Sequence, residues 1–509
     1  MLRAVVRRLQ SPAALAAGLA GLLLLGLLVG IEPRGGDPDR LYRPLKVELA
    51  RLLAQGRLPF WTDRLGLGIP LLAESHVAAL YPINWLLYGL FSVSAAYRLA
   101  MWLHHVWLAL STYAYARFLK VSPQGAALAA IGFTFCGFQA IHSSHEPFYH
   151  ALPYLPLALL LAEWHLASGR FLALVLLACA WGLQLTLGHF QVQAWTAGLV
   201  LVLGIWRTIA DRRPWWRFPG LVAALCWGAA LAAVQLRTSW ELARFLGFTH
   251  RSFAELAFYS MPPAHWAELA IPAFLRGIPG GPEGLYWLSQ GSTGYESCFY
   301  IGTIPVFLAL LALGGARDRR LVPWLVLAVA AVLLAMLPRL WPAGYASVTR
   351  LPGLGWFRAP GRYTLVASLG LCLAAGSGLD RAGADPPGAF RLGLIVAWSF
   401  ALAAAGWAFY WTSGRGLQTR LGGPRLALVL GLAAFCWSTA TALVLAWRRR
   451  KLGASWLVVA TAVELGGLYY TSTTVWGLAV HLPGESAVLT RLAREPGVGR
   501  VAGVVANLP

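Results

Sequence analysis

The stretch AALAAGLAGLLLLGLLVGIEPRGGDPD, residues 13–39, decides the fold, because an unbroken apolar run gives way there to a polar, acidic turn. The apolar part, residues 13–31, has the roughly 20 residues that an α-helix needs to cross a bilayer. It is longer than a signal-peptide core, and no clear small-x-small cleavage site follows it. Because Arg3, Arg7 and Arg8 precede it, we expect an uncleaved first transmembrane helix with a cytoplasmic N-terminus.

Apolar runs of this kind recur along the whole chain. Of its 509 residues, 58% are hydrophobic and 12% are charged, and the mean hydropathy is +0.62. A soluble protein carries about twice that charged fraction. The composition therefore predicts an all-α polytopic membrane protein. We expect about thirteen transmembrane helices, at residues 13–31, 95–118, 123–142, 149–166, 170–189, 191–209, 217–236, 298–315, 321–338, 361–380, 391–411, 424–447 and 453–471.

The loops between these runs alternate between arginine-rich and arginine-poor. Cytoplasmic loops carry the excess of Lys and Arg in membrane proteins, so the alternation indicates an N-terminus inside and a C-terminus outside. The basic residues of the predicted inner loops are Arg117, Lys120, Arg170, Arg207, Arg212, Arg213, Arg217, Arg317, Arg319, Arg320, Arg381, Arg391, Arg448, Arg449, Arg450 and Lys451.

This topology gives one transmembrane domain over residues 1–471. Its predicted outer loops are residues 32–94, 142–149, 237–297 and 339–360. We expect residues 472–509 to be the start of a truncated extracytoplasmic region, in which residues 500–506 read as a strand. A lone strand is not stable without a partner.

Charge and cysteine content exclude several classes of function. The net charge is +21, but no basic run is interleaved with base-stacking aromatic residues, so we expect no nucleic-acid partner. Five of the six cysteines lie within apolar runs, and none forms a CxxC motif. We therefore expect neither a structural disulfide nor a zinc site.

Two segments of the first outer loop have apolar character without the length of a span. Residues 77–91 are short and contain Pro82 and Asn84, so we expect an interfacial or re-entrant segment. Residues 41–53 have leucines at helical spacing opposite a basic face, which predicts an amphipathic helix in the membrane interface. Its basic face either holds lipid phosphates or merely accompanies a helix that anchors the loop.

The first candidate for chemistry is the Asp37-Pro38-Asp39 sequence, directly beyond the first helix. Two carboxylates at this spacing can bind a divalent metal ion, and one of them can act as a general base. The proline and the preceding glycines suit an ordinary turn equally well.

Further polar residues collect at the predicted outer ends of later helices. His145 and Glu146 lie in a histidine-rich loop that either holds a metal or a phosphate-bound substrate or caps two helices, and its spacing matches no standard zinc motif. His189 and Gln191 either line a cavity or join helices by hydrogen bonds.

Three more candidates lie farther along the chain. Glu296 either stabilises a helix N-terminus or points into the same cavity as Asp37. Arg358 and Arg362 lie on the predicted outer face, against the positive-inside trend, and arginine suits bidentate phosphate binding.

Taken in order, these segments resemble the YfhO-like family of bacterial multi-pass membrane proteins, which is related to the GT-C class of glycosyltransferases. The resemblance implies a GT-C-like fold with long extracytoplasmic loops. The matching pieces are Gly36-Asp37, residues 56–61 with Gly66, Gly68, Pro70 and Tyr81-Pro82, residues 188–191, Glu296 with residues 300–302, and residues 357–362.

The resemblance also implies a reaction. A sugar would pass from a polyprenyl-phosphate carrier to an envelope glycan acceptor at the outer face of the bacterial cytoplasmic membrane. Asp37 or Asp39 would be the catalytic base or a ligand of Mg²⁺ or Mn²⁺, and Glu146 beside His145 would be the acidic group of the second outer loop. Arg358 and Arg362 would neutralise the departing phosphate. No nucleotide site is needed, and neither a Walker nor a Rossmann motif occurs.

Two other functions remain open from the sequence. A transporter or flippase of lipid-linked saccharides would carry polar groups through the full membrane depth, whereas here they crowd at the predicted outer end. That distribution favours an enzyme. A non-catalytic envelope-assembly protein is the third possibility, and it would not depend on Asp37 and Asp39.

Overall fold

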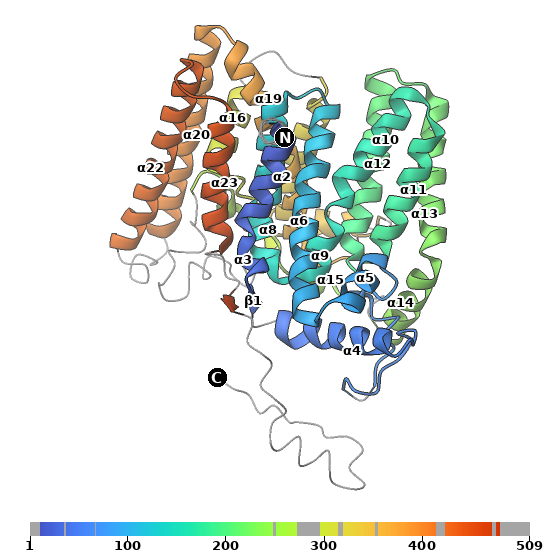
Figure 1. Ribbon diagram of the computed structural model, residues 1–509. Helices are drawn as coiled ribbons and strands as arrows, with labels where there is room; N and C mark the ends of the chain where they lie inside the picture. The colour runs from blue at the N-terminus through green and yellow to red at the C-terminus, as the bar shows by residue number, and fades with distance from the viewer. Residues whose placement is uncertain are drawn as a thin grey trace, which may run out of the picture.

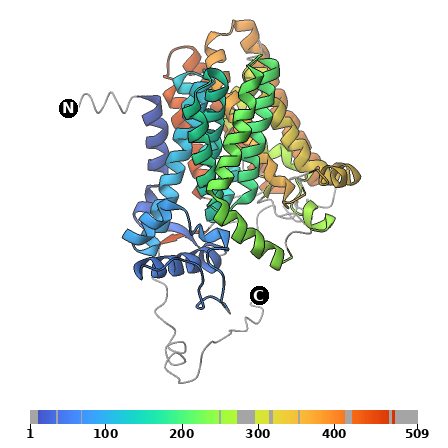
Figure 2. The ribbon, with the colours of Figure 1, turned by 90° about the vertical axis from the view of Figure 1, so that its right-hand side faces the viewer.

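The computed structural model describes residues 11–34, 37–66, 68–247, 251–271, 296–313, 319–351, 355–413, 423–470 and 475–478. Long helices run side by side through these ranges and form one bundle, seen from two directions in Figure 1 and Figure 2. The chain is an all-α polytopic membrane protein, as the composition predicts.

The elements of the first half alternate between long helices and short pieces that surround the polar candidates. They are α2 (Pro12–Leu23), α3 (Leu25–Leu28), β1 (Ile31–Arg34), the π-helix η1 (Pro38–Tyr42), α4 (Arg43–Ala54), η2 (Ser75–Val77), α5 (Pro82–Leu90), α6 (Val93–Phe118), α7 (Pro123–Thr134), α8 (Gly137–Ile141), η3 (His142–Ser144), α9 (Glu146–Ala151), α10 (Tyr154–Ser168), α11 (Phe171–Leu185), α12 (Phe190–Ala210), η4 (Trp215–Arg217), α13 (Phe218–Leu231) and α14 (Ala233–Phe245).

The second half completes the bundle. Its elements are α15 (Phe253–Ala257), η5 (Pro263–Leu269), α16 (Thr303–Leu313), α17 (Val322–Leu340), α18 (Pro342–Val348), η8 (Pro360–Tyr363), α19 (Thr364–Ala384), α20 (Pro387–Ser413), α22 (Gly423–Arg448), α23 (Ser455–Tyr470) and β2 (Val475–Leu478).

Every predicted apolar run contains a helix, but the count of thirteen spans is not confirmed. Among the described residues, six helices are long and apolar enough to cross a membrane, or seven when α13 and α14, bent by 72°, form one span. The runs at 13–31, 170–189 and 298–315 contain helices of only 12, 15 and 11 residues. A straight span needs roughly 20 residues, so hydropathy alone overestimates the unbroken length of these helices.

Two short segments of the first outer loop form helices, and their predicted place in the membrane interface stays a prediction. The apolar segment at 77–91 contains the nine-residue helix α5, which is too short to span and begins at Pro82. The amphipathic segment forms α4, whose buried leucines include Leu45 and Leu49. On the basic face of α4, the side chains of Arg43 and Lys46 are buried in ion pairs, which favours the alternative of a helix that anchors the loop over one that holds lipid phosphates.

A small sheet joins two distant parts of the chain. Strand β1 pairs antiparallel with β2, with Ile31 opposite Leu478. The sequence predicts helix up to residue 31, so this strand is a correction: the chain leaves the helix after Leu28 and its backbone bonds with the segment beyond α23 instead. The predicted strand at 500–506 lies outside the described residues.

Helix α19 lies in the interior of the bundle and packs against α7, α16 and α17. Gly125 of α7 and Gly376 of α19 face each other so closely that a Cβ on either would strike the backbone carbonyl of the other. Small residues allow helices to approach in this way. This contact fixes the C-terminal half of α19. Just before its N-terminal end, Gly361 lies against the backbone carbonyls of Tyr259 and Glu296, next to the predicted site residue Arg362.

The two ends of the bundle differ in chemistry. We call the end that carries α4, α5 and β1 the α4 pole, and the opposite end the arginine pole (Figure 1). At the arginine pole, arginine side chains donate to backbone carbonyls at helix ends, as Arg217 does to Leu166 and Arg381 to Ala312, both at 2.8 Å. The candidate residues predicted from the sequence collect at the α4 pole.

Candidate functional site

Asp37 and His145 meet at the α4 pole, although they lie in different loops. His145 Nε2 lies 3.2 Å from Asp37 Oδ2. The Asp37 side chain is 53% exposed and that of His145 is 27% exposed. The hydrogen bond from His145 is the main cause that lowers the pKa of Asp37 below its ordinary value. The pair therefore presents an ionised carboxylate to the outside of the protein.

The two carboxylates of the Asp37-Pro38-Asp39 sequence do not act together. Asp39 Oδ1 lies 3.0 Å from Nε of Arg43, one turn later, so the two acids face different partners. The part of the chain that the structure describes holds no group of three or more His, Cys, Asp or Glu side chains arranged for a metal ion. The donor set at Asp37 thus does not fit the expected Mg²⁺ or Mn²⁺ site, and we derive no step through a metal.

Glu296 and Arg362 form a buried, bidentate ion pair. Arg362 Nε and Nη2 donate to the two carboxylate oxygens at 2.6 and 2.7 Å, and His142 Nε2 lies 2.9 Å from Oε2. Burial acts to raise the pKa of Glu296, but Arg362 and His142 hold it well below its ordinary value. Glu296 and Arg362 are ion-pair partners of each other, and the expectation that they bind substrate stays a prediction.

This ion pair belongs to a longer chain of contacts. Arg362 Nη1 donates to Gln191 Oε1 at 3.1 Å, and Gln191 Nε2 donates to the backbone carbonyl of Arg358 at 3.1 Å. At the other end, the ring centroids of His142 and His145 lie 5.2 Å apart. We call the resulting series the outer network. It consists of Asp37, His145, His142, Glu296, Arg362, Gln191 and Arg358.

A second buried ion pair fixes α4 against α9. Lys46 Nζ lies 2.9 Å from Glu146 Oε1, and both side chains are at most 1% exposed. Lys46 also donates to the Val77 carbonyl at 2.7 Å. Glu146 was expected to contact substrate, but the structure places it inside the protein. Because Glu146 directly follows His145 and Lys46 lies in the helix that follows Asp37, this pair fixes both members of the exposed pair.

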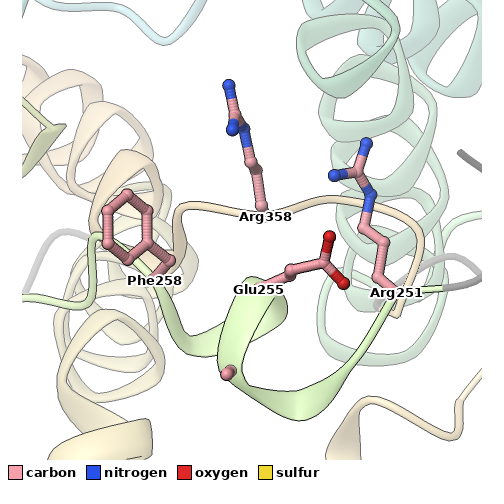
Figure 3. Close-up of a pocket in the computed structure, with 5 residues that line it drawn as sticks. Arg251, Glu255, Phe258 and Arg358 are labelled. Carbon is pink, nitrogen blue, oxygen red and sulfur yellow. The ribbon is translucent and has the colours of Figure 1, made fainter.

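Arg358 faces a pocket that the sequence did not reveal. The pocket has a volume of about 240 Å³ and is lined by Arg251, Ala254, Glu255, Phe258 and Arg358. Figure 3 shows the guanidinium groups of Arg251 and Arg358 extending to the same side of the short helix α15. Two arginines that converge on one pocket suit a phosphate group.

The pocket also contains one negative charge. Glu255 accepts hydrogen bonds from the backbone N–H and the hydroxyl of Ser252, at 2.7 and 2.9 Å, as a helix cap, and its carboxylate also interacts with the charges of Arg251 and Arg358. Burial, and next the charge of Arg358, lower the pKa of Arg251. An anion between the two guanidinium groups would relieve that repulsion. The Ser252–Glu255 capping box is the local sequence signal that could have indicated a short helix here.

His189 lies behind the exposed surface. Its ring centroid is 4.4 Å from that of Phe148, and its Nδ1 is buried without a hydrogen-bond partner among the described residues. The neighbouring Gly188 has φ +77°, and a Cβ there would collide with the carbonyl of Ser75. His189 therefore packs the interior of the site, and Gly188 allows the loop at residue 75 to approach it.

That loop brings in two residues that the sequence reasoning missed. His76 Nδ1 lies 2.6 Å from Glu74 Oε1, and the two side chains are 38% and 29% exposed. A carboxylate two residues before a histidine is too common a pattern to indicate a site by itself. The position of the Glu74–His76 pair depends on contacts with α14 and with Gly188, which are distant in sequence.

No family model matches the chain, and no curated protein matches it. Among solved structures, ArnT from Cupriavidus metallidurans bound to undecaprenyl phosphate is similar with a TM-score of 0.48 and 15% identity, over 90% of this chain and 76% of that one.

A second similar structure is the arabinofuranosyltransferase AftD from Mycobacteria. Its TM-score is 0.41 at 16% identity, over 81% of this chain and 28% of that one. Both TM-scores lie below 0.5, so these likenesses carry no argument about the chemistry of this chain. The resemblance to the YfhO-like family stands on its sequence segments alone and is not confirmed.

Proposed function

We propose that this chain is a GT-C-type membrane glycosyltransferase. It moves a sugar from a polyprenyl-phosphate carrier to a hydroxyl of an envelope glycan, at the outer face of the bacterial cytoplasmic membrane. One observation carries the proposal: Asp37 is half exposed with an imidazole beside it, whereas Glu146 and Glu296 are buried in ion pairs. A base for a large, external acceptor must be reachable, and Asp37 meets this requirement.

In the proposed reaction Asp37 takes the proton of the acceptor hydroxyl. The freed oxygen forms a bond to the anomeric carbon of the sugar, and the bond between that carbon and the phosphate oxygen breaks. The electron pair leaves with the lipid phosphate. His145 keeps Asp37 ionised and oriented through the 3.2 Å contact. A positioned general base typically contributes about 10²- to 10⁴-fold to the rate.

The proposed phosphate site is the pocket of Arg251 and Arg358. Guanidinium groups stabilise the charge that develops on a leaving phosphate. The outer network links this pocket to Asp37, since Gln191 holds the Arg358 carbonyl and His142 lies beside His145. Arg362 and Glu296 are then positioning residues, which hold the two halves of the site without touching substrate.

The experiment that tests this function uses the full chain in proteoliposomes. We would supply radiolabelled polyprenyl-phosphate sugar with a glycan acceptor, and in parallel a nucleotide sugar with the same acceptor. The proposal expects label in the acceptor from the lipid donor only. Transfer from the nucleotide sugar alone, or no transfer by a correctly folded chain, would contradict it.

The same assay separates transfer from transport. A flippase would move the labelled lipid between leaflets without forming a new glycosidic bond, so the label would stay with lipid after extraction. An assembly protein would do neither. The proposed function requires that the label leave the lipid fraction and appear in the glycan.

A further inference from the structure

Glu74 and His76 form a second carboxylate–imidazole pair at the α4 pole. The carboxylate can only accept a hydrogen bond when ionised, so Nδ1 of the His76 ring donates to Glu74 across 2.6 Å. In the neutral ring this leaves the lone pair on Nε2. Burial acts to raise the pKa of Glu74, but the hydrogen bond and charge of His76 bring it below its ordinary value. Glu74 therefore remains ionised and fixes the tautomer of His76.

The backbone around this pair is held from two sides. Gln235 Nε2 of α14 donates to the Leu72 carbonyl at 3.0 Å, and Ser239 Oγ of the same helix donates to the Ala73 carbonyl at 2.9 Å. Ser75 Oγ donates to the Gly188 carbonyl at 3.3 Å. These bonds fix the loop on which His76 stands, while its side chain remains 38% exposed. An exposed group on a fixed backbone is typical of a preorganised site.

His76 lies in the same electrostatic neighbourhood as Asp37. After the hydrogen bond and charge of His145, the charge of His76 is the next influence that lowers the pKa of Asp37. The ring centroid of His76 lies 6.1 Å from that of Tyr42, the last residue of η1, and Asp37 directly precedes η1. The titratable and charged groups that face His76 from the surrounding elements are Asp37, Tyr42, Lys46, Glu146 and His189.

We propose that His76, oriented by Glu74, receives the acceptor proton from Asp37 and returns it to solvent. This inference rests on the proposed function. The proton leaves the acceptor oxygen for the Asp37 carboxylate and then moves to Nε2 of His76, which becomes an imidazolium. The electron pair of the broken sugar–phosphate bond leaves with the phosphate, so charge and atoms balance.

The chemistry explains why a second group is useful. A carboxylate that its surroundings keep ionised holds a proton poorly, so the proton must move on before Asp37 can act again. An imidazole titrates near neutral pH and exchanges protons readily with water. His145 is less suited to this step, because its Nε2 is already engaged with Asp37 and its Nδ1 is buried.

The test compares sugar transfer by the wild type and by His76→Ala in proteoliposomes across a range of pH. In the wild type the rate should rise with pH, since only a neutral imidazole accepts a proton. The variant should lose about 100-fold in kcat with little change in KM, and should lose this rise. Free imidazole in the buffer should restore much of the rate. A variant with the wild-type rate and pH profile would overturn the inference.

Glu74→Gln provides the matched test if the alanine variant does not fold. It keeps the size of the side chain and an oxygen that accepts from Nδ1, but it removes the negative charge that stabilises the imidazolium. Without that charge the imidazolium form is less favoured, so the rise in rate should move to lower pH. A purely structural role would reduce the amount of folded protein without moving this rise. An unmoved rise in a folded Glu74→Gln variant contradicts the proposal.

Two controls, the His165→Gln variant and the activity of the wild type itself, distinguish a failure of the proposed function from a failure of the role of His76. His165→Gln alters a histidine of the arginine pole that contacts the carbonyls of Arg170 and Arg217, and it should leave the pH profile unchanged. If the folded wild type transfers no sugar, the proposed function fails. If the wild type is active and both pair variants behave like it, only the role of His76 fails.

Discussion

The ion pair Glu163–Arg207 at the arginine pole and the pair Asp37–His145 at the α4 pole use similar groups in opposite ways. Arg207 donates to both oxygens of Glu163 at 3.1 Å, and Tyr115 adds a third bond at 2.8 Å. Arg207 also donates to the Arg320 carbonyl. Asp37 has one described side-chain partner at 3.2 Å and is half exposed. The carboxylate of Glu163 is buried and has several hydrogen-bond donors, whereas that of Asp37 is partly exposed to solvent.

This difference in burial and partners distinguishes structural from functional charges in this chain. A buried charge that loses a partner costs several kcal/mol, so a saturated pair is retained for the sake of the fold. An exposed charge contributes little to stability, so its loss should appear mainly in activity. Each pair joins a carboxylate to a nitrogen base, and the two pairs differ in burial and in the number of partners of the carboxylate.

The largest expected effect is that of Asp37→Asn on transfer. The amide cannot take the acceptor proton, so kcat should fall about 10²- to 10⁴-fold, whereas the half-exposed position should leave the unfolding transition unchanged. Asp39→Asn is the matched control, because it removes the neighbouring carboxylate with only a modest effect on kcat. Equal losses in the two variants would mean that the two acids act together after all.

The next effect should appear in stability rather than in activity. Glu163→Gln leaves Arg207 buried without its full charge partner and should lower the free energy of unfolding by about 3–5 kcal/mol. The kcat per folded molecule should stay at the wild-type value. Denaturant titration of the detergent-solubilised protein measures this free energy of unfolding. Glu241→Gln, in the exposed pair with Arg237, is the control and should leave stability nearly unchanged.

A smaller effect is expected at the phosphate pocket. Arg251→Gln and Arg358→Gln should each raise KM for the lipid-phosphate donor about 10-fold, which corresponds to about 1.4 kcal/mol for a lost charge-assisted contact. Steady-state kinetics over a range of donor concentrations measure this. Arg350→Gln, an exposed arginine outside the pocket, should behave as the wild type. A KM that does not change in either pocket variant would place the phosphate elsewhere.

The smallest effect concerns the acid side of the pH profile. Asp37 must be ionised to act, so transfer is present above its pKa and is lost as the pH falls through it. His145→Ala removes the bond that lowers this pKa, and the loss should therefore begin at a higher pH than in the wild type. Rates measured from neutral to acidic pH test the shift. An unmoved acid limb would show that His145 does not tune Asp37.

Much of the fold was predictable from the sequence, because hydropathy records which segments prefer a membrane. All thirteen predicted runs contain a helix, and the short segment at 77–91 and the amphipathic segment at 41–53 each contain a short helix. Breaks within helices were not predictable, since α2 ends at Leu23 and α13 bends before α14 without a proline at either break. The pairing of β1 with β2 joins segments too short and too distant to identify from local patterns.

The candidate site was predictable in its location but not in its division of roles. Asp37, His145 and Arg358 were found because polar residues at the ends of apolar runs are conspicuous. Glu146, Glu296 and Arg362 have the same local signal, yet burial against other loops makes them positioning residues in the present proposal.

The residues that the sequence analysis missed have no local signal. Arg251 and His76 lie in long loops with no periodic pattern, and their importance arises only when distant loops meet. Sequence patterns show which polar residues lie at the ends of apolar runs. They do not show which of these residues will find a partner inside the protein, because that depends on contacts across the bundle.

The central claim is that the exposed pair performs chemistry on a lipid-phosphate sugar and that the saturated pair does not. The most direct test measures transfer of label from polyprenyl-phosphate sugar to acceptor, per folded molecule, for wild type, Asp37→Asn and Glu163→Gln in the same proteoliposome preparation. We predict transfer by the wild type and by Glu163→Gln, and its loss in Asp37→Asn. Transfer that survives in Asp37→Asn, or that disappears in folded Glu163→Gln, would contradict the claim.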